Sequence, residues 1–83
     1  AYPADVLRGA WETLLTNQFH DILAGTVIPQ AIAEARTEMA TVETTANRVL
    51  NDALTAIAAR IPASDDTFVV FNPTDTLRPS DVV

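Results

Sequence analysis

The sequence of 83 residues contains no cysteine, which excludes disulfide bonds and metal sites built on thiolates. Its only glycines are Gly9 and Gly25, so it has no glycine-rich loop that could hold a phosphate group. Serine is confined to Ser64 and Ser80, and neither is flanked by the glycines of a nucleophile elbow. These absences remove several common kinds of enzyme site and leave histidine and the carboxylates as candidates for chemistry.

Basic residues are also few. The chain has 5 Lys and Arg against 11 Asp and Glu, which gives a net charge of −6 and a pI of about 4.3. Such a chain repels nucleic-acid backbones and anionic membrane surfaces, so neither is expected as a partner. No apolar run approaches the roughly 20 residues that span a bilayer, and the N-terminus does not resemble a signal peptide. The lack of cysteine and the abundance of alanine suit a bacterial cytoplasmic protein.

Two helices are predicted from apolar spacing. The first covers residues 3–17, where the apolar residues on one face are Leu7, Ala10, Trp11, Leu14 and Leu15. Trp11 is expected to pack in a core rather than to serve as a platform for a sugar. Gly25 is a break, and Thr26 is a candidate N-cap for the second helix.

The second helix is long, because no proline or glycine interrupts residues 30–61 and Pro62 ends it. It carries a seven-residue apolar repeat formed by Ile28, Ile32, Ala35, Met39, Val42, Ala46, Val49, Ala53 and Ile57. Its length is about 35 residues, or on the order of 50 Å. Whether the helix is continuous across residues 47–51 is left open by the pattern.

The C-terminal segment differs in character. Residues 67–71 are β-branched and aromatic, which predicts a strand, and Asn72 and Pro73 indicate a turn. Residues 74–83 read as a loop with the start of another strand. The expected fold is mainly α, an antiparallel helical bundle of a short and a long helix with a short C-terminal strand. The expected division is a helical domain at 1–62 and a linker with a first β-strand at 63–83.

This arrangement cannot close on itself, because the short helix covers less than half of the long apolar stripe and a lone strand needs partners. The chain therefore reads as a section of a larger protein or as a self-associating bundle.

His20 is the only histidine and is followed by Asp21. Imidazole and carboxylate are both zinc ligands, but a loop histidine is more often simply solvated or hydrogen-bonded. A zinc site needs at least three protein ligands, so any other donors must come from another segment or chain. Adjacent helical positions point about 100° apart, so the two side chains are expected to do different jobs. Asp65 and Asp66 read as a solvated loop rather than as a catalytic pair.

Two strings resemble the family 38 glycoside hydrolases, which are α-mannosidases. Residues 11–26 read WETLLTNQFHDILAGT, similar to the family signature of a tryptophan, paired leucines, NQFHDIL and GT. Residues 69–73 read VVFNP, like a later strand of the family. One departure is Ala24, where many relatives have proline, and it is expected to have little chemical effect.

The resemblance implies a fragment of a zinc-dependent retaining α-mannosidase that hydrolyses terminal α-mannosides. In that family the histidine of this string is a zinc ligand and the next aspartate contacts sugar hydroxyls, which would be His20 and Asp21. The nucleophile, the acid/base group and the other ligands of the shared Zn²⁺ site have no counterpart here, so the fragment is expected to be inert alone. Its partners would be the mannoside and the remainder of the α-mannosidase chain.

The family's middle domain is a three-helix bundle, and the first helix of that bundle is missing from this sequence. The isolated fragment is therefore expected to form a homodimer that replaces this helix with a copy of itself. The alternative is a self-associating helical interaction module without a catalytic role.

Overall fold

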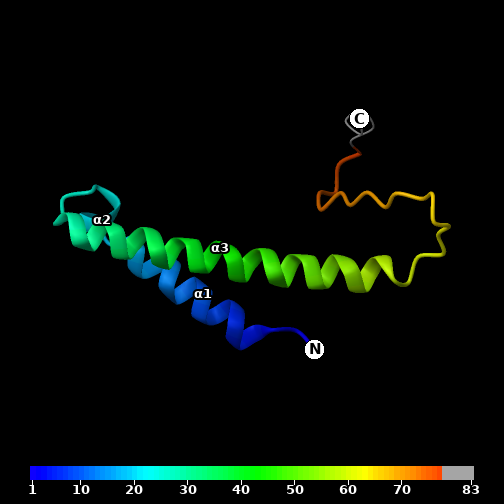
Figure 1. Cartoon of the computed structure of the whole chain (residues 1–83), viewed down its shortest axis with the longest axis horizontal. Coiled ribbons are helices and arrows are strands. Elements are labelled where there is room, and N and C mark those ends of the chain that lie inside the picture. The colour runs from blue at the N-terminus through cyan, green and yellow to red at the C-terminus, as the bar shows by residue number, and fades with distance from the viewer. Residues whose placement is uncertain (78–83) are drawn as a thin grey trace.

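Three helices make up the computed structural model, which describes residues 1–77: α1 (Ala4–Asn17), α2 (His20–Leu23) and α3 (Pro29–Ala58). α1 and α3 run antiparallel, close together at the end that carries α2 and diverging toward the N-terminus (Figure 1). The expected helical class is therefore confirmed. None of the helices in the described residues is long and apolar enough to cross a membrane.

α1 begins at Ala4, one residue after the predicted start, with Pro3 as its N-cap. Asp5 lies in its first turn, where a negative charge suits the helix dipole. The residues least exposed on it are Leu7, Ala10, Thr13, Leu14 and Asn17. The expectation that Trp11 lies in a core is wrong, because its side chain is 60% exposed. One residue step turns a helix by about 100°, so Trp11 points away from the side on which Ala10 approaches α3.

α3 is a single continuous helix of 30 residues, which includes residues 47–51. It begins at Pro29 rather than at Thr26, with Ile28 as its N-cap, so the predicted role of Thr26 as an N-cap is wrong. It ends at Ala58, and turn-type hydrogen bonds follow, from Arg60 N to Ile57 O and from Ile61 N to Ala58 O. Because a proline disfavours helical backbone in the residue before it, Pro62 accounts for an end in this region.

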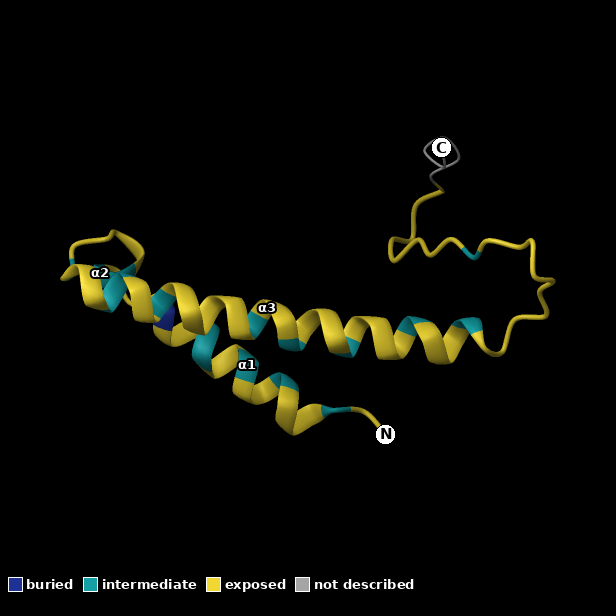
Figure 2. Cartoon of the chain, viewed as in Figure 1, coloured by how far each residue is buried: buried dark blue, intermediate teal, exposed yellow. Residues whose placement is uncertain are grey.

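The apolar stripe is largely uncovered. No hydrophobic residue is buried in the described part of the chain, and the single buried position lies in α1 near α2 (Figure 2). The accessible surface is 7312 Å², whereas a compact protein of 8.9 kDa exposes about 4,800 Å². The radius of gyration is 18.0 Å, against about 12 Å for a compact domain of this length. The expectation that the short helix leaves much of the apolar stripe uncovered is confirmed.

The predicted strand at residues 67–71 does not form in the described chain. Phe68 is 93% exposed and Val70 is 62% exposed, and no neighbouring segment pairs with them. A strand needs a partner for its backbone groups, which explains the difference. Asp65 and Asp66 lie in an exposed turn, as expected. The predicted start of a further strand falls partly on residues 78–83, outside the described residues.

Candidate functional site

A tight connection joins α1 to α2. After Asn17 the backbone forms a turn with hydrogen bonds between residues three apart. Gln18 N donates to Leu15 O at 3.1 Å, and Phe19 N donates to Thr16 O at 3.2 Å. Phe19 is the N-cap of α2, and its carbonyl accepts a hydrogen bond from Leu23 N at 3.0 Å. α2 itself was not predicted, because four residues are too few to show a helical period. His20 therefore stands at the first position of a short helix directly after α1.

Gly25 closes α2. Its φ of +73° is left-handed, a conformation that glycine adopts without a steric penalty. Gly25 N donates to Ile22 O at 3.1 Å and Thr26 N donates to Asp21 O at 3.0 Å, the paired bonds of a Schellman motif. The Thr26 hydroxyl also lies 3.3 Å from Asp21 O and 3.4 Å from Asp21 Oδ1. Thr26 thus bonds back to α2, which explains why it does not cap α3.

His20 and Asp21 are brought together at the surface. His20 Nε2 lies 3.4 Å from Asp21 Oδ2, and the side chains are 78% and 50% exposed. The expectation that adjacent residues point apart is wrong here, because the first turn of a helix has no preceding turn to restrict its rotamers. The Phe19 ring lies against the imidazole, with centroids 4.3 Å apart and planes at 42°. The imidazole is therefore oriented from one side and open to solvent on another.

The donors around His20 do not complete a metal site. Across residues 1–77, no group of three or more His, Cys, Asp or Glu side chains is placed to hold a metal ion. His20 presents an exposed imidazole, and Asp21 presents a carboxylate beside it. These residues fit a contribution of one ligand to a site shared with other polypeptide, since zinc requires at least three protein ligands.

Asn17 is the functional candidate that sequence reasoning missed. It is 7% exposed and is the only buried residue in the described part of the chain. Its Nδ2 donates to Thr13 O at 2.9 Å and to Glu38 Oε2 at 2.7 Å, so it joins α1 to α3. The sequence signal was weak, because Asn17 lies at helical spacing from Ala10 and Leu14 but is polar.

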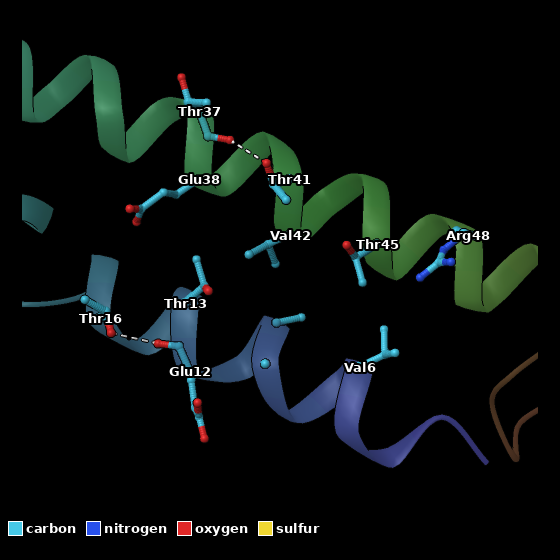
Figure 3. Close-up of a pocket in the computed structure, with 12 residues that line it drawn as sticks. Val6, Glu12, Thr13, Thr16, Thr37, Glu38, Thr41, Val42, Thr45 and Arg48 are labelled. Atoms are coloured by element: carbon cyan, nitrogen blue, oxygen red, sulfur yellow. Dashed lines mark hydrogen bonds between the residues drawn. The ribbon is translucent and has the colours of Figure 1, made fainter.

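A groove of about 760 Å³ runs between the diverging helices. Much of its lining is small, with Gly9, Ala10 and Thr13 on α1 opposite Val42 and Thr45 on α3. Thr13 and Val42 reach into the space between the helices, whereas Glu12 points away (Figure 3). No residue of the α1–α3 connection lines this groove, so it is separate from His20 and Asp21.

Residues 1–57 match the family described as the alpha mannosidase middle domain. The chain is 33% identical over 69 residues to alpha-mannosidase 2C1 of Homo sapiens and 30% identical over 69 residues to alpha-mannosidase 2C1 of Mus musculus. Each alignment covers 83% of this chain and 7% of the relative. No solved structure matches the chain significantly. Because the match spans more than half of its length and includes α2, which carries His20 and Asp21, this chain belongs to the α-mannosidase middle-domain family.

Proposed function

We propose that this chain is part of a zinc-dependent retaining α-mannosidase, to which it contributes a zinc ligand, His20, and a substrate contact, Asp21. The observation that carries the proposal is the exposed His20–Asp21 pair on a short helix whose ends are both fixed by backbone hydrogen bonds. The pair lies within the residues that match the α-mannosidase middle domain. A pair held in this way can meet donors from another part of the enzyme without a large loss of conformational entropy.

His20 suits the role of ligand because its imidazole is accessible and is backed by the Phe19 ring. When bound, zinc would act as a Lewis acid and template for adjacent mannose hydroxyls during glycosidic cleavage. Such an ion needs at least three protein ligands, and residues 1–77 contain no group of three that could hold it. The remaining ligands and the catalytic carboxylates would therefore come from the rest of the enzyme, and the isolated chain would be inert.

Asp21 suits the role of substrate contact because its carboxylate is half exposed and its backbone is anchored by Thr26. A carboxylate accepts hydrogen bonds from two or more hydroxyl groups, which is the donor pattern that a mannose ring presents. The Thr26 hydroxyl near Oδ1 favours one orientation of this carboxylate. Asp21 would thus orient the sugar, while the neighbouring imidazole would hold the metal.

The uncovered surface supports a role as one part of a larger enzyme. The chain spans about 7% of the length of the curated relatives it matches, and it exposes about 2,500 Å² more surface than a compact protein of its mass. We propose that the remainder of the α-mannosidase covers the apolar faces of α1 and α3. Residues 63–83 would be the linker and first strand of a following β domain, which explains why residues 67–71 find no partner here.

The decisive experiment compares two variants of the complete enzyme. His20→Ala should remove bound zinc, measured by metal analysis after dialysis, and should abolish most mannosidase activity. Asp21→Asn should retain zinc but lower kcat/KM for an aryl α-mannoside by about 10- to 100-fold, since a charged hydrogen bond to the sugar is lost. Asp66→Asn, at an exposed turn, is the matched control and should change neither. Full zinc content and full activity in His20→Ala would overturn the proposal.

The exposed stripe favours self-association of the isolated chain, which is the second candidate. A copy of the chain would cover the apolar faces that the rest of the enzyme otherwise covers. Light scattering coupled to size exclusion should then give about twice the monomer mass of 8.9 kDa. A monomer at all concentrations would contradict this. Self-association together with unaltered activity in His20→Ala would favour an interaction module without a catalytic role.

A further inference from the structure

Asn17 makes the one directional link between the two long helices. Both hydrogens of its side-chain amide are used, one by Thr13 O at 2.9 Å within α1 and one by Glu38 Oε2 at 2.7 Å on α3. Within residues 1–77 no other side-chain hydrogen bond joins α1 to α3. The bond to Glu38 is short and charge-assisted, and such bonds are stronger and more geometrically selective than neutral ones.

The apolar contacts around this bond fix the position of α1 along α3 less sharply than the bond does. Leu14, Ile22 and Ile32 line a shallow hollow next to Asn17, and none of them is fully buried. Apolar contact is non-directional, so helices joined only in this way can slide or rotate at small cost. The Asn17–Glu38 bond therefore sets the register of the end of α1 along α3.

The position of the end of α1 determines the position of His20, which is three residues farther along the chain. The intervening backbone is hydrogen-bonded to the last turn of α1, through Gln18 N to Leu15 O and Phe19 N to Thr16 O. Only Gln18 and Phe19 lie between the end of α1 and the start of α2 at His20. A shift of the last turn of α1 would therefore move the imidazole as one body with it.

We infer that Asn17 is a positioning residue, which through Glu38 holds His20 at the place where it meets the other zinc ligands. This inference rests on the proposed function, since it assumes that His20 binds zinc. Asn17 itself touches neither metal nor substrate, and its effect passes through the α1–α2 turn.

The test uses the complete enzyme and measures its affinity for zinc alone by competition with a chelator. Asn17→Asp places a carboxylate against Glu38 and the Thr13 carbonyl, and should weaken zinc binding about tenfold, the lower end of the range for residues that orient a metal ligand. Asn17→Asp combined with Glu38→Gln reverses donor and acceptor across the same gap, so it should recover most of the lost affinity. Glu38→Gln alone keeps an acceptor and should have a smaller effect.

Two controls separate positioning from folding. Asn51→Asp makes the same chemical change at an exposed position of α3 and should leave zinc affinity unchanged. The melting temperature of the zinc-free enzyme is recorded for each variant, because a purely structural role would lower it without changing the zinc dissociation constant of the folded protein. If Asn17→Asp does not fold, Glu38→Ala at an exposed position replaces it, and a loss of zinc affinity is again expected.

The outcomes distinguish this inference from the proposed function. Unchanged zinc affinity in Asn17→Asp or Glu38→Ala, or an absence of recovery in the double variant, would overturn the positioning role while His20→Ala still loses zinc. If His20→Ala also keeps its zinc, the proposed function itself fails.

Discussion

Replacing Gly25 with alanine should loosen the turn that holds Asp21, because Gly25 adopts a φ of +73°. A Cβ built at this position meets no atom within 4 Å, so the penalty is a property of the backbone and not of a clash. Left-handed backbone costs an L-residue about 1–2 kcal/mol, and the lower entropy of alanine in the open state offsets about 0.4–1 kcal/mol. The net loss of local stability is about 1 kcal/mol.

Hydrogen exchange followed by mass spectrometry in the complete enzyme measures this loss. The amides of residue 25 and Thr26 donate to the carbonyls of Ile22 and Asp21, so they exchange when the turn opens. A loss of about 1 kcal/mol corresponds to about fivefold faster exchange. Gly25→Asn should exchange at an intermediate rate, since asparagine tolerates this conformation better than alanine.

Gly9→Ala is the matched control, with the opposite sign expected. Gly9 lies within α1 and also has nothing within 4 Å of an added Cβ. Alanine is favoured over glycine in a helix by about 1 kcal/mol, so the amides of α1 should exchange more slowly. Unchanged exchange around residue 25 in Gly25→Ala would refute the reasoning about the turn. Faster exchange in Gly9→Ala would indicate that another part of the enzyme packs against the groove that Gly9 lines.

Three further predictions follow from exposure and hydrogen bonding. Thr26→Val should raise KM for an aryl mannoside about twofold with zinc content unchanged, because the contacts of the hydroxyl to Asp21 are long, and an unchanged KM would contradict its orienting role. Trp11→Ala should change the thermal melting of the isolated chain little, since the side chain is 60% exposed, but should destabilise the complete enzyme by about 3 kcal/mol if the rest of the protein covers it. Equal effects in the two contexts would argue against such a cover. Phe68→Asp should leave the helical circular dichroism of the isolated chain unaltered, because Phe68 is 93% exposed. The same change should reduce the soluble yield of the complete enzyme, and a normal yield would show that residues 67–71 join no sheet.

Several features of the structure could be predicted from residues that lie close together in the sequence. The helical periods predicted α1 and α3, and the absence of proline and glycine from residues 30–61 agrees with a helix unbroken from Pro29 to Ala58. Gly25 was correctly identified as a break, since a glycine after an apolar segment commonly ends a helix. The string around His20 indicated the α-mannosidase family, which the match over residues 1–57 confirms. These features depend on residues that are near one another in the chain, so their interactions can be read from spacing.

Other features were decided only by the tertiary structure. Spacing could not tell that Asn17 is buried against Glu38 while Trp11 stays exposed, because the apolar pattern of α1 includes Trp11 and leaves out the polar Asn17. Spacing also could not show that Thr26 hydrogen-bonds back to Asp21 instead of capping α3. Which of these roles Thr26 takes depends on the left-handed turn at Gly25. Residues 67–71 have the composition of a strand but form none here. The physical reason is common to all three, because a buried polar contact, a backward hydrogen bond and a paired strand each require a partner whose position is set by the folded chain.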